Sequence, residues 1–375
     1  MADHIVLAGG GSAGHVNPLL ATAAELQARE PGVALTVLGT AEGLEADLVP
    51  AAGLELTVIE KVPMPRRPNL DALRFPRRWR RAIRTARDAV GGARAVVGFG
   101  GYVATPAYLA ARRLGVPIVI HEQNALPGLA NRLGARWAEA VGVTFAGTPL
   151  PKARWVGLPL RRPIADLVAA RATDAWGRAR DGARACGLDP DRRTVLVTGG
   201  SLGALRLNEQ IPTIAAELVA AGAQVLHATG RGKLEPVLAA RSAMPPDVAA
   251  HYHAVEYLTE MHEALACADL MIGRAGAGTV SELAALGIAA VYVPLPVGNG
   301  EQRRNATGVV EAGGGLLVED QELTTDWLRE RVLPLIADSE RLRAMGQAAS
   351  SAGVRDGAAR LADLVREAAE GRRTR

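Results

Sequence analysis

The sequence predicts an α/β protein made of two similar doubly wound domains, each built on a parallel sheet. Short aliphatic runs alternate with amphipathic stretches rich in Ala, Leu and Arg, which is the pattern of parallel strands joined by helices. The pattern also restarts, because "IVLAGGGSAGHVNPLLATAAEL" (5–26) and "TVLVTGGSLGALRLNEQIPTIAAEL" (194–218) both contain a strand, a loop with Gly-Gly-Ser and a helix. The 375 residues, 49% of them hydrophobic, suffice for two domains with separate cores.

Strand runs are predicted in both halves of the chain. They lie near His4–Ala8, Ala34–Gly39, Ala95–Gly98, Val116–His121, Thr194–Thr198, Gln224–Ala228, Leu270–Gly273 and Ala289–Pro294. The segment 157–194 between the two sets has early prolines and a late Gly/Asp/Pro cluster, so we place the domain junction near residue 160. We expect domains at 1–160 and 161–349, with a final helix at about 350–375 that packs back on the first domain. In paired α/β domains, sites lie in a cleft that faces the carboxyl ends of both sheets.

Composition narrows the class of protein. Cys186 and Cys267 are far apart in sequence and no His/Cys cluster has metal-ligand spacing, so we expect a reducing cytosol and neither a disulfide framework nor a metal site. The start "MADHIVLAGG" has no basic region followed by a long apolar run, so we expect no secretory signal. No apolar run reaches the roughly 18 residues that span a bilayer, so any membrane contact is expected to be peripheral. A net charge of +4 and 3% aromatic residues disfavour nucleic acid as a partner.

The first glycine loop, "GGGSAG" (9–14), fits the G-x-G-x-x-G fingerprint of dinucleotide-binding domains. That fingerprint also needs an acid at the end of the second strand to bind the ribose, and Gly39 and Thr40 stand there instead. A nicotinamide cofactor is therefore disfavoured, although Glu42 leaves it open.

His15 follows this loop in the first turn of the predicted helix. The partial positive charge of a helix N-terminus disfavours protonation of an imidazole, so His15 is suited to accept a proton near neutral pH. The alternative is a histidine that only caps the helix or packs beneath the loop.

The most informative stretch of the second half is "DLMIGRAGAGTVSELAALGIAAVYVPLPVGNGEQRRNA" (269–306). Its small-residue loop at 275–278 lets backbone N–H groups approach phosphate or sugar oxygens at a helix N-terminus. Glu282 is placed to accept hydrogen bonds from two vicinal hydroxyls. The alternative is an ordinary first-turn acid that stabilises the helix dipole.

Several loops together resemble the MurG family, UDP-N-acetylglucosamine transferases of peptidoglycan synthesis that act on lipid I. They are "GGGSAGHVNP", "GFGGYVATPAYLAA" (98–111), "HEQNALPGLANR" (121–132), "TGGSLGALRLNE" (198–209), "EYLTEMHEALACADLMIGRAGAGTVSELAALG" (256–287) and "GNGEQRRNA" (298–306). The resemblance covers almost the whole chain in the family's order. It implies a GT-B fold, two Rossmann-like domains facing a cleft, with the acceptor bound by the first domain and the UDP-sugar by the second.

The resemblance also implies residue roles. His15 would be the general base that deprotonates the C4 hydroxyl of the acceptor sugar, and Tyr102 would lie on the acceptor side. Arg161 and Ser201 would bind the diphosphate, while the backbone of Leu258 would hold uracil. The implied UDP-GlcNAc-binding residues are Ser12, Ala13, Gly14, Asn124, Arg161, Ser201, Leu258, Ala277, Gly278, Thr279, Val280, Ser281, Glu282, Glu301 and Gln302. UDP-GlcNAc is a substrate, and no metal or other cofactor is implied.

The chain departs from the family's pattern at a few positions. The family commonly has Gln where Leu202 stands and often His where Val297 stands. At the two positions that Glu301 and Gln302 occupy here, it frequently has Gln-Gln. Glu301 and Gln302 are the positions implied to read the GlcNAc hydroxyls, so these departures concern sugar specificity. His15 and Glu282, the latter implied to bind the ribose hydroxyls, match the pattern.

The segment "MPRRPNLDALRFPRRWRRAIRTAR" (64–87) is rich in arginine and has a single acid, Asp71. Its simplest interpretation is a solvated helix face, and a nucleic-acid patch is a second one. We favour docking on an anionic leaflet, because the implied acceptor is a lipid-linked sugar diphosphate and each nearby arginine adds about 1 kcal/mol of attraction. The expected membrane contacts are Phe75, Trp79, Arg77, Arg78, Arg80 and Arg81.

The implied reaction is inverting transfer of GlcNAc from UDP-GlcNAc to the C4 hydroxyl of MurNAc-pentapeptide in lipid I, which gives lipid II. The implied location is the cytoplasmic face of the cell membrane, as a peripheral protein. One alternative is a GT-B transferase that moves another nucleotide-activated sugar onto a small-molecule acceptor. The other is a nucleotide-sugar-binding module without turnover.

Overall fold

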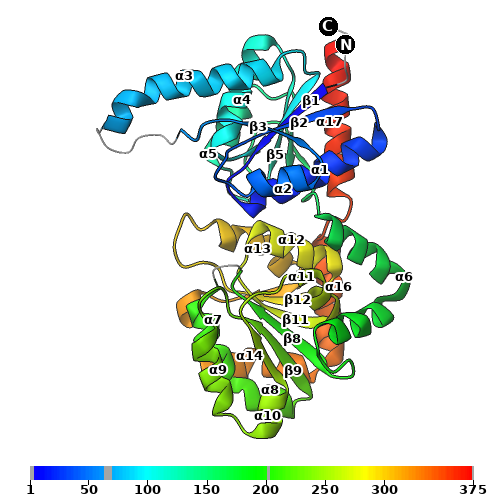
Figure 1. The fold of residues 1–375 in the computed structure, drawn as a ribbon. Helices are drawn as coiled ribbons and strands as arrows, with labels where there is room; N and C mark the ends of the chain where they lie inside the picture. The colour runs from blue at the N-terminus through cyan, green and yellow to red at the C-terminus, as the bar shows by residue number, and fades with distance from the viewer. Residues whose placement is uncertain (1–3, 63–69, 201–202, 374–375) are drawn as a thin grey trace. The chain divides into compact units, whose positions relative to one another are not determined.

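The structure, a computed structural model, describes residues 4–62, 70–200 and 203–373. The chain forms two units (Figure 1). The first unit comprises the residues up to Arg162 together with those from Asp356 onward, and the second comprises Pro163–Arg355.

The first unit is built on a parallel sheet with the strand order β3-β2-β1-β4-β5-β6-β7. Its strands are β1 (His4–Gly9), β2 (Ala34–Gly39), β3 (Glu55–Val58), β4 (Ala95–Gly100), β5 (Ile118–Glu122), β6 (Ala140–Val143) and β7 (Ala153–Trp155). The chain order reverses between β1 and β4, so the loops after these two strands diverge at the point where Rossmann-like sheets place ligands.

Helices cover both faces of this sheet. They are α1 (Ala13–Arg29), α2 (Glu45–Ala51), α3 (Leu70–Val90), α4 (Gly101–Leu114), α5 (Leu129–Gly134) and α17 (Gly357–Arg373). Val6 and Ala8 of β1 face a core with α3 and α4, whereas Ile5 and Leu7 face a core with α1 and α17. The carboxylate of Asp363 on α17 accepts from Arg29 on α1 at 2.7 Å. The last helix of the chain is therefore part of the first unit.

The second unit repeats the architecture with a six-stranded parallel sheet in the order β10-β9-β8-β11-β12-β13. Its strands are β8 (Arg193–Thr198), β9 (Ala223–Ala228), β10 (Tyr252–Val255), β11 (Ala268–Gly273), β12 (Ala289–Tyr292) and β13 (Gly315–Leu317). Its helices are α6 (Arg162–Ala185), α7 (Leu205–Gln210), η1 (Ile211–Ile214), α8 (Ala215–Ala220), α9 (Leu234–Ser242), α10 (Pro246–Ala250), α11 (Met261–Cys267), α12 (Ala277–Leu286), α13 (Glu301–Glu311), η2 (Asp320–Glu322), α14 (Thr325–Arg331), α15 (Leu333–Ala337) and α16 (Ser339–Ala352).

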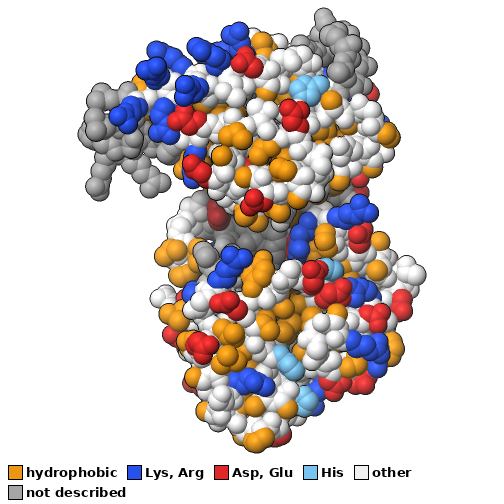
Figure 2. Space-filling view, viewed as in Figure 1, with side chains coloured by type: hydrophobic (Ala, Val, Ile, Leu, Met, Phe, Trp, Pro, Cys, Tyr) orange, Lys and Arg blue, Asp and Glu red, His pale blue; other side chains and the backbone are white. Residues whose placement is uncertain are grey.

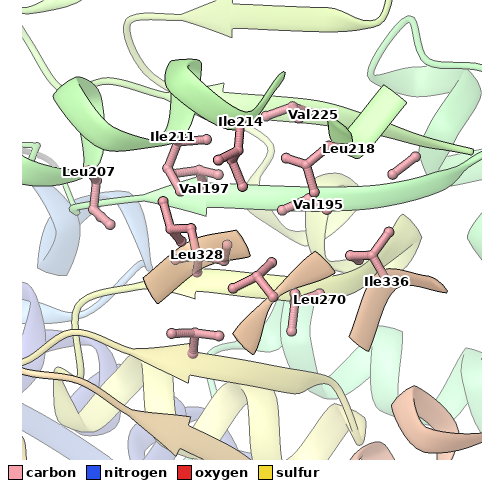
Figure 3. Packing of buried hydrophobic residues seen from close by; sticks show 14 of the residues in the cluster. Val195, Val197, Leu207, Ile211, Ile214, Leu218, Val225, Leu270, Leu328 and Ile336 are labelled. Atoms are coloured by element: carbon pink, nitrogen blue, oxygen red, sulfur yellow. The ribbon is translucent and has the colours of Figure 1, made fainter. Parts of the chain in front are cut away.

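Aliphatic side chains from the strands and the helices above them form the core of this unit. Val195 and Val197 of β8 pack with Ile214 and Leu218 from the following helical segment and with Leu328 of α14 (Figure 3). All five are fully buried. Burying the branched side chains of such a strand contributes roughly 1.5–3 kcal/mol each.

The predicted fold class, two parallel doubly wound α/β domains, is confirmed, and each predicted strand is present to within two residues. Sequence reasoning missed five short strands: β3, β6, β7, β10 and β13. Four of them are sheet edges and the fifth, β6, lies next to one, and every residue of β7 is exposed. Such strands lack the long buried aliphatic run that signals a central strand.

Candidate functional site

The first glycine loop connects β1 to α1 and places His15 in the first turn of α1. His15 is half-buried, and its Nδ1 lies 2.9 Å from Ser12 Oγ, within hydrogen-bond distance. Burial lowers the pKa of His15 below its usual value, and a hydrogen bond with the Gly10 backbone and the charge of Glu45 oppose this only in part. The imidazole is therefore neutral near pH 7, as the sequence predicted, although burial is the largest cause.

Two glycines at the start of α4 let this helix approach the first loop closely. Gly100 has φ 94° and Gly101 has φ 80°, backbone conformations that residues with a side chain rarely adopt. A Cβ at Gly100 would lie 3.2 Å from Nε2 of His15, and one at Gly101 would lie 2.8 Å from the carbonyl oxygen of Gly10. The "GFGG" motif thus shapes the surroundings of the His15 ring.

Glu45, at the start of α2, is a residue that sequence reasoning missed. It is fully buried, and its carboxylate accepts hydrogen bonds from the Gly11 N–H at 2.8 Å and from the N–H and hydroxyl of Thr40 at 2.8 and 2.7 Å. Burial alone would raise its pKa, but these hydrogen bonds outweigh it and lower the pKa below the usual value. Glu45 is therefore a buried carboxylate held against the first glycine loop.

The "HEQN" loop after β5 is organised by Glu122. This buried carboxylate accepts from the N–H of Asn124 at 2.9 Å, the N–H of Gly128 at 3.0 Å and the side-chain amide of Asn131 at 2.9 Å. Tyr108 in turn donates to Asn131 at 2.7 Å. The Asn131 amide nitrogen would lie 3.4 Å from a Cβ at Gly100, so the Asn124 loop and His15 meet at the same end of the sheet.

His121, the first residue of that motif, is fully buried. Its Nε2 lies 2.9 Å from the Gly157 carbonyl and its Nδ1 lies 3.1 Å from the side-chain amide of Gln123. Burial lowers its pKa to about 4. His121 is thus a neutral packing residue that joins β5 to the end of the first unit.

In the second unit, six of the residues predicted to bind the sugar nucleotide are consecutive at the start of α12. The N-cap residue of α12 is Gly276, which has an extended backbone and provides no side-chain hydrogen bond to the helix start. The residues Ala277 to Glu282 lie in the first two turns. A Cβ at Gly278 would have no heavy atom within 4 Å, so space is open there. Glu282 is the sixth residue of the helix, and the first turn contains no acid. The alternative that Glu282 is a first-turn acid is wrong.

Side chains from neighbouring elements brace this helix start. Arg274 donates to the carbonyls of Val293 and Pro294 at 3.1 and 3.0 Å, and it pairs with Asp320 at 2.6 Å. Asn305 of α13, fully buried, donates to the Ala275 carbonyl at 3.3 Å. The bracing residues were not identified from the sequence, because an Arg or Asn beside a glycine loop carries no spacing signal.

The predicted sugar-reading pair lies where α13 begins. Gln302 accepts from the Leu295 N–H through its side-chain oxygen at 3.0 Å, while the N–H of Glu301 donates to Asn299 at 3.2 Å. Both side chains are half-buried. This hydrogen bond orients the Gln302 amide, whose NH₂ group can donate to a ligand.

The second glycine loop follows β8, and Ser201 and Leu202 lie outside the described residues. On the described side, a Cβ at Gly203 would collide with the Thr229 carbonyl, which accepts from Asn208 at 3.0 Å. The side chain of Asn208 is also hydrogen-bonded to His227, which is buried. This burial lowers the pKa of His227 to about 4. His227 is thus a packing residue. Leu258, predicted to hold uracil, is half-buried between β10 and α11.

Arg161 and Tyr102 belong to the first unit. Arg161 is half-buried just before α6, and Tyr102, in the first turn of α4, is 52% exposed with Lys61 5.9 Å from its ring centroid. The half-exposed ring on the same helix start as Gly101 suits a contact with a substrate.

The basic segment forms α3, and its part before Leu70 lies outside the described residues. Figure 2 shows Lys and Arg side chains gathered over this helix. Phe75 and Trp79 stack on each other with ring centroids 5.7 Å apart, and both pack against the core of the first unit. Arg78 pairs with Glu60 at 2.6 Å. The exposed arginines are Arg74, Arg77, Arg80, Arg81, Arg84 and Arg87.

Within the described ranges, the structure shows no group of three His, Cys, Asp or Glu residues arranged to hold a metal ion. The same residues include no helix that is both long and apolar enough to cross a membrane. Both cysteines are free thiols.

Comparison with known proteins identifies the family to which this chain belongs. Residues 5–143 match the glycosyltransferase family 28 N-terminal domain, and residues 194–361 match the C-terminal domain of the same family. The UDP-N-acetylglucosamine–N-acetylmuramyl-(pentapeptide) pyrophosphoryl-undecaprenol N-acetylglucosamine transferase of Clavibacter sepedonicus is 56% identical over 374 residues, which cover 99% of this chain and 98% of the relative. The protein of the same name from Streptomyces coelicolor is 51% identical over 375 residues, 99% of this chain and all of the relative. Among solved structures, Acinetobacter baumannii MurG superposes with a TM-score of 0.77 at 28% identity, over 97% of this chain and 99% of that one.

Proposed function

The chain belongs to glycosyltransferase family 28, and from this membership we propose that it transfers GlcNAc from UDP-GlcNAc to the N-acetylmuramyl sugar of a pyrophosphoryl-undecaprenol acceptor. One observation carries the proposal: relatives named for this reaction are 51–56% identical to the chain over nearly its full length. The resemblance to the MurG family that the loops indicate is confirmed by the same relatives.

His15 is the general base of the proposed reaction. In the tautomer in which Nδ1–H donates to Ser12 Oγ, Nε2 carries no proton and can take one from the C4 hydroxyl, and the lowered pKa keeps the ring neutral and able to accept it. As that oxygen bonds to the anomeric carbon of GlcNAc, the bond from this carbon to UDP breaks and UDP leaves with the electron pair. Attack from the opposite side inverts the anomeric configuration.

Most of the proposed donor contacts lie in the second unit. The N–H groups at the start of α12, which no side chain caps, meet the anionic diphosphate, and Glu282 accepts from the ribose hydroxyls. Arg161 and Ser201 add charge and hydrogen bonds at the diphosphate, and Leu258 lies against uracil. These contacts stabilise the leaving UDP as its charge grows. Gln302 and Glu301 read the GlcNAc hydroxyls.

The enzyme works at the cytoplasmic leaflet as a peripheral protein. Support comes from the exposed arginines of α3 and from the lipid acceptor in the relatives' names. Because Phe75 and Trp79 pack on the core, the attraction is mainly electrostatic rather than by insertion of the rings.

The test is UDP release by purified protein supplied with UDP-GlcNAc and a lipid I analogue, with His15→Ala beside a matched control, His251→Ala in the second unit. We expect turnover by the wild type and the control, and loss of about 10²–10⁴-fold in kcat for His15→Ala with UDP-GlcNAc affinity within a few-fold of normal. A nucleotide-sugar-binding module would release no UDP, and a small-molecule transferase would ignore the lipid in favour of another donor and acceptor in a panel. Near-normal turnover by His15→Ala would show that His15 is not the general base.

A further inference from the structure

The first glycine loop already holds an anion, and the anion belongs to the chain itself. In dinucleotide-binding domains, the N–H groups of such a loop point at a phosphate. Here the Gly11 N–H donates at 2.8 Å to Oε2 of Glu45, and both polar groups of Thr40 donate to Oε1. The carboxylate is fully buried, so its contacts are with the protein rather than with solvent.

Three glycines around Glu45 make the room for its carboxylate. A Cβ at Gly10 or Gly43 would lie well inside 3.0 Å of the carboxylate oxygens, and one at Gly39 would lie 2.5 Å from the Cγ of Glu45. These glycines come from the first loop, the end of β2 and the turn before α2. Three segments that the β1–β2 pairing brings together are therefore shaped around one side chain.

We propose that Glu45 is the positioning residue of the catalytic loop: it takes the place of a bound phosphate, holds the Gly9–Gly14 loop, which carries Ser12 and leads directly into His15, and favours the imidazolium formed when His15 accepts a proton. This inference rests on the proposed role of His15 as base. It also means that the Gly11 N–H binds Glu45 and not a phosphate of donor or acceptor.

The charges around His15 agree with this assignment. Glu45, from α2, raises the pKa of His15 against the larger effect of burial. On the α4 and β5 sides, Glu122 lies behind the Asn131 amide, and Lys61 lies over the ring of Tyr102. Neither of these two contributes to the pKa shift of His15, whereas Glu45 does. His121 remains neutral above pH 4 to 5 because its pKa is about 4.

Glu45→Gln tests the proposal, with the nearby exposed Glu42→Gln as the matched control. The glutamine keeps the size of the side chain but loses its charge, and its NH₂ group, a donor, faces an N–H or O–H donor where a carboxylate oxygen accepted a hydrogen bond. We expect kcat to fall about 10- to 100-fold, with the UDP-GlcNAc Kd and KM within a few-fold of wild type, because most of the implied donor residues belong to the second unit, far along the chain from the loop that Glu45 holds. The acid limb of the kcat/KM profile moves to lower pH, since the pKa of His15 falls when the negative charge is removed.

The pKa of His15 can be read without substrate, from the imidazole Cε1–H signals of the full chain labelled at histidine and assigned with His15→Gln. A lower pKa in Glu45→Gln and an unchanged one in Glu42→Gln support the inference even if transfer to the lipid acceptor is not found, which would sink only the proposed function. If the wild type turns over but Glu45→Gln matches it in kcat and pH profile, or loses only donor affinity, the inference is wrong. Should Glu45→Gln not fold, Thr40→Val removes one donor to the carboxylate and is expected to lower kcat in the same direction by a smaller factor; wild-type kcat for Thr40→Val would overturn the proposal.

Discussion

Gly100→Ala isolates the contact between β4 and the imidazole of His15. Gly100 has φ 94° and ψ −167°, a conformation essentially reserved for glycine, so a side chain there costs about 1–3 kcal/mol of folding free energy. Its new methyl group would lie 3.2 Å from Nε2 of His15 and 3.4 Å from the amide nitrogen of Asn131. The distance to the His15 ring is tighter than ordinary van der Waals contact, whereas the distance to the Asn131 amide is at the lower edge of the ordinary range, so the ring must shift by a few tenths of an ångström.

The backbone strain can be separated from this contact by a control. Gly92→Ala carries a comparable positive φ of 78°, but its methyl group would meet no atom within 4 Å. We expect both variants to lose about 1–3 kcal/mol in urea denaturation. Only Gly100→Ala should also lose about 10- to 100-fold in kcat at saturating UDP-GlcNAc, because small misplacements of a reacting group are costly.

The measurements are urea melts by circular dichroism, initial rates of UDP release with a lipid I analogue, and UDP-GlcNAc affinity by calorimetry. Donor affinity should match the wild type in both variants. If Gly100→Ala retains the kcat of Gly92→Ala, the close approach of β4 does not set the position of the base.

Three further predictions follow from the same structure. Glu282→Ala should weaken UDP-GlcNAc binding by about 1.5–3 kcal/mol and remove the preference over the 2′-deoxyribose analogue; unchanged affinity by calorimetry would remove Glu282 from the ribose site. Replacing Arg77, Arg80 and Arg81 by Gln should reduce salt-sensitive co-sedimentation with anionic vesicles while sparing turnover on a short-chain soluble acceptor, whereas equal loss on that acceptor would contradict docking. The pKa of His227 is about 4 when folded against 6.5 unfolded, so between these values the unfolded chain binds more protons and stability falls as pH falls, by up to about 3 kcal/mol. Because His121 has a similarly lowered pKa, His227→Gln should reduce, and not abolish, the fall of the urea midpoint between pH 7 and 4.5; an unchanged fall would show that His227 does not contribute to it.

Much of the architecture could be read from the sequence, because central parallel strands are buried on both faces and appear as continuous aliphatic runs. The glycine loops were equally visible, since a loop that lets the backbone approach closely needs residues without a Cβ. Edge strands such as β7 gave no such signal, because exposed residues carry no hydrophobic pattern. Membership in the family followed from loops that keep their order along nearly the whole chain.

The sequence by itself determined the fold class, the duplicated strand–loop–helix pattern and the position of His15 beside a glycine loop. Only the tertiary structure decided what occupies that loop. Glu45 stands 34 residues after Gly11, among other acids that look the same in sequence, and Glu42 was the one that the spacing singled out. The β1–β2 pairing brings Glu45, and not Glu42, against the Gly11 N–H. A buried carboxylate is stable only where donors from separate segments converge on it, and that convergence is a property of the folded chain.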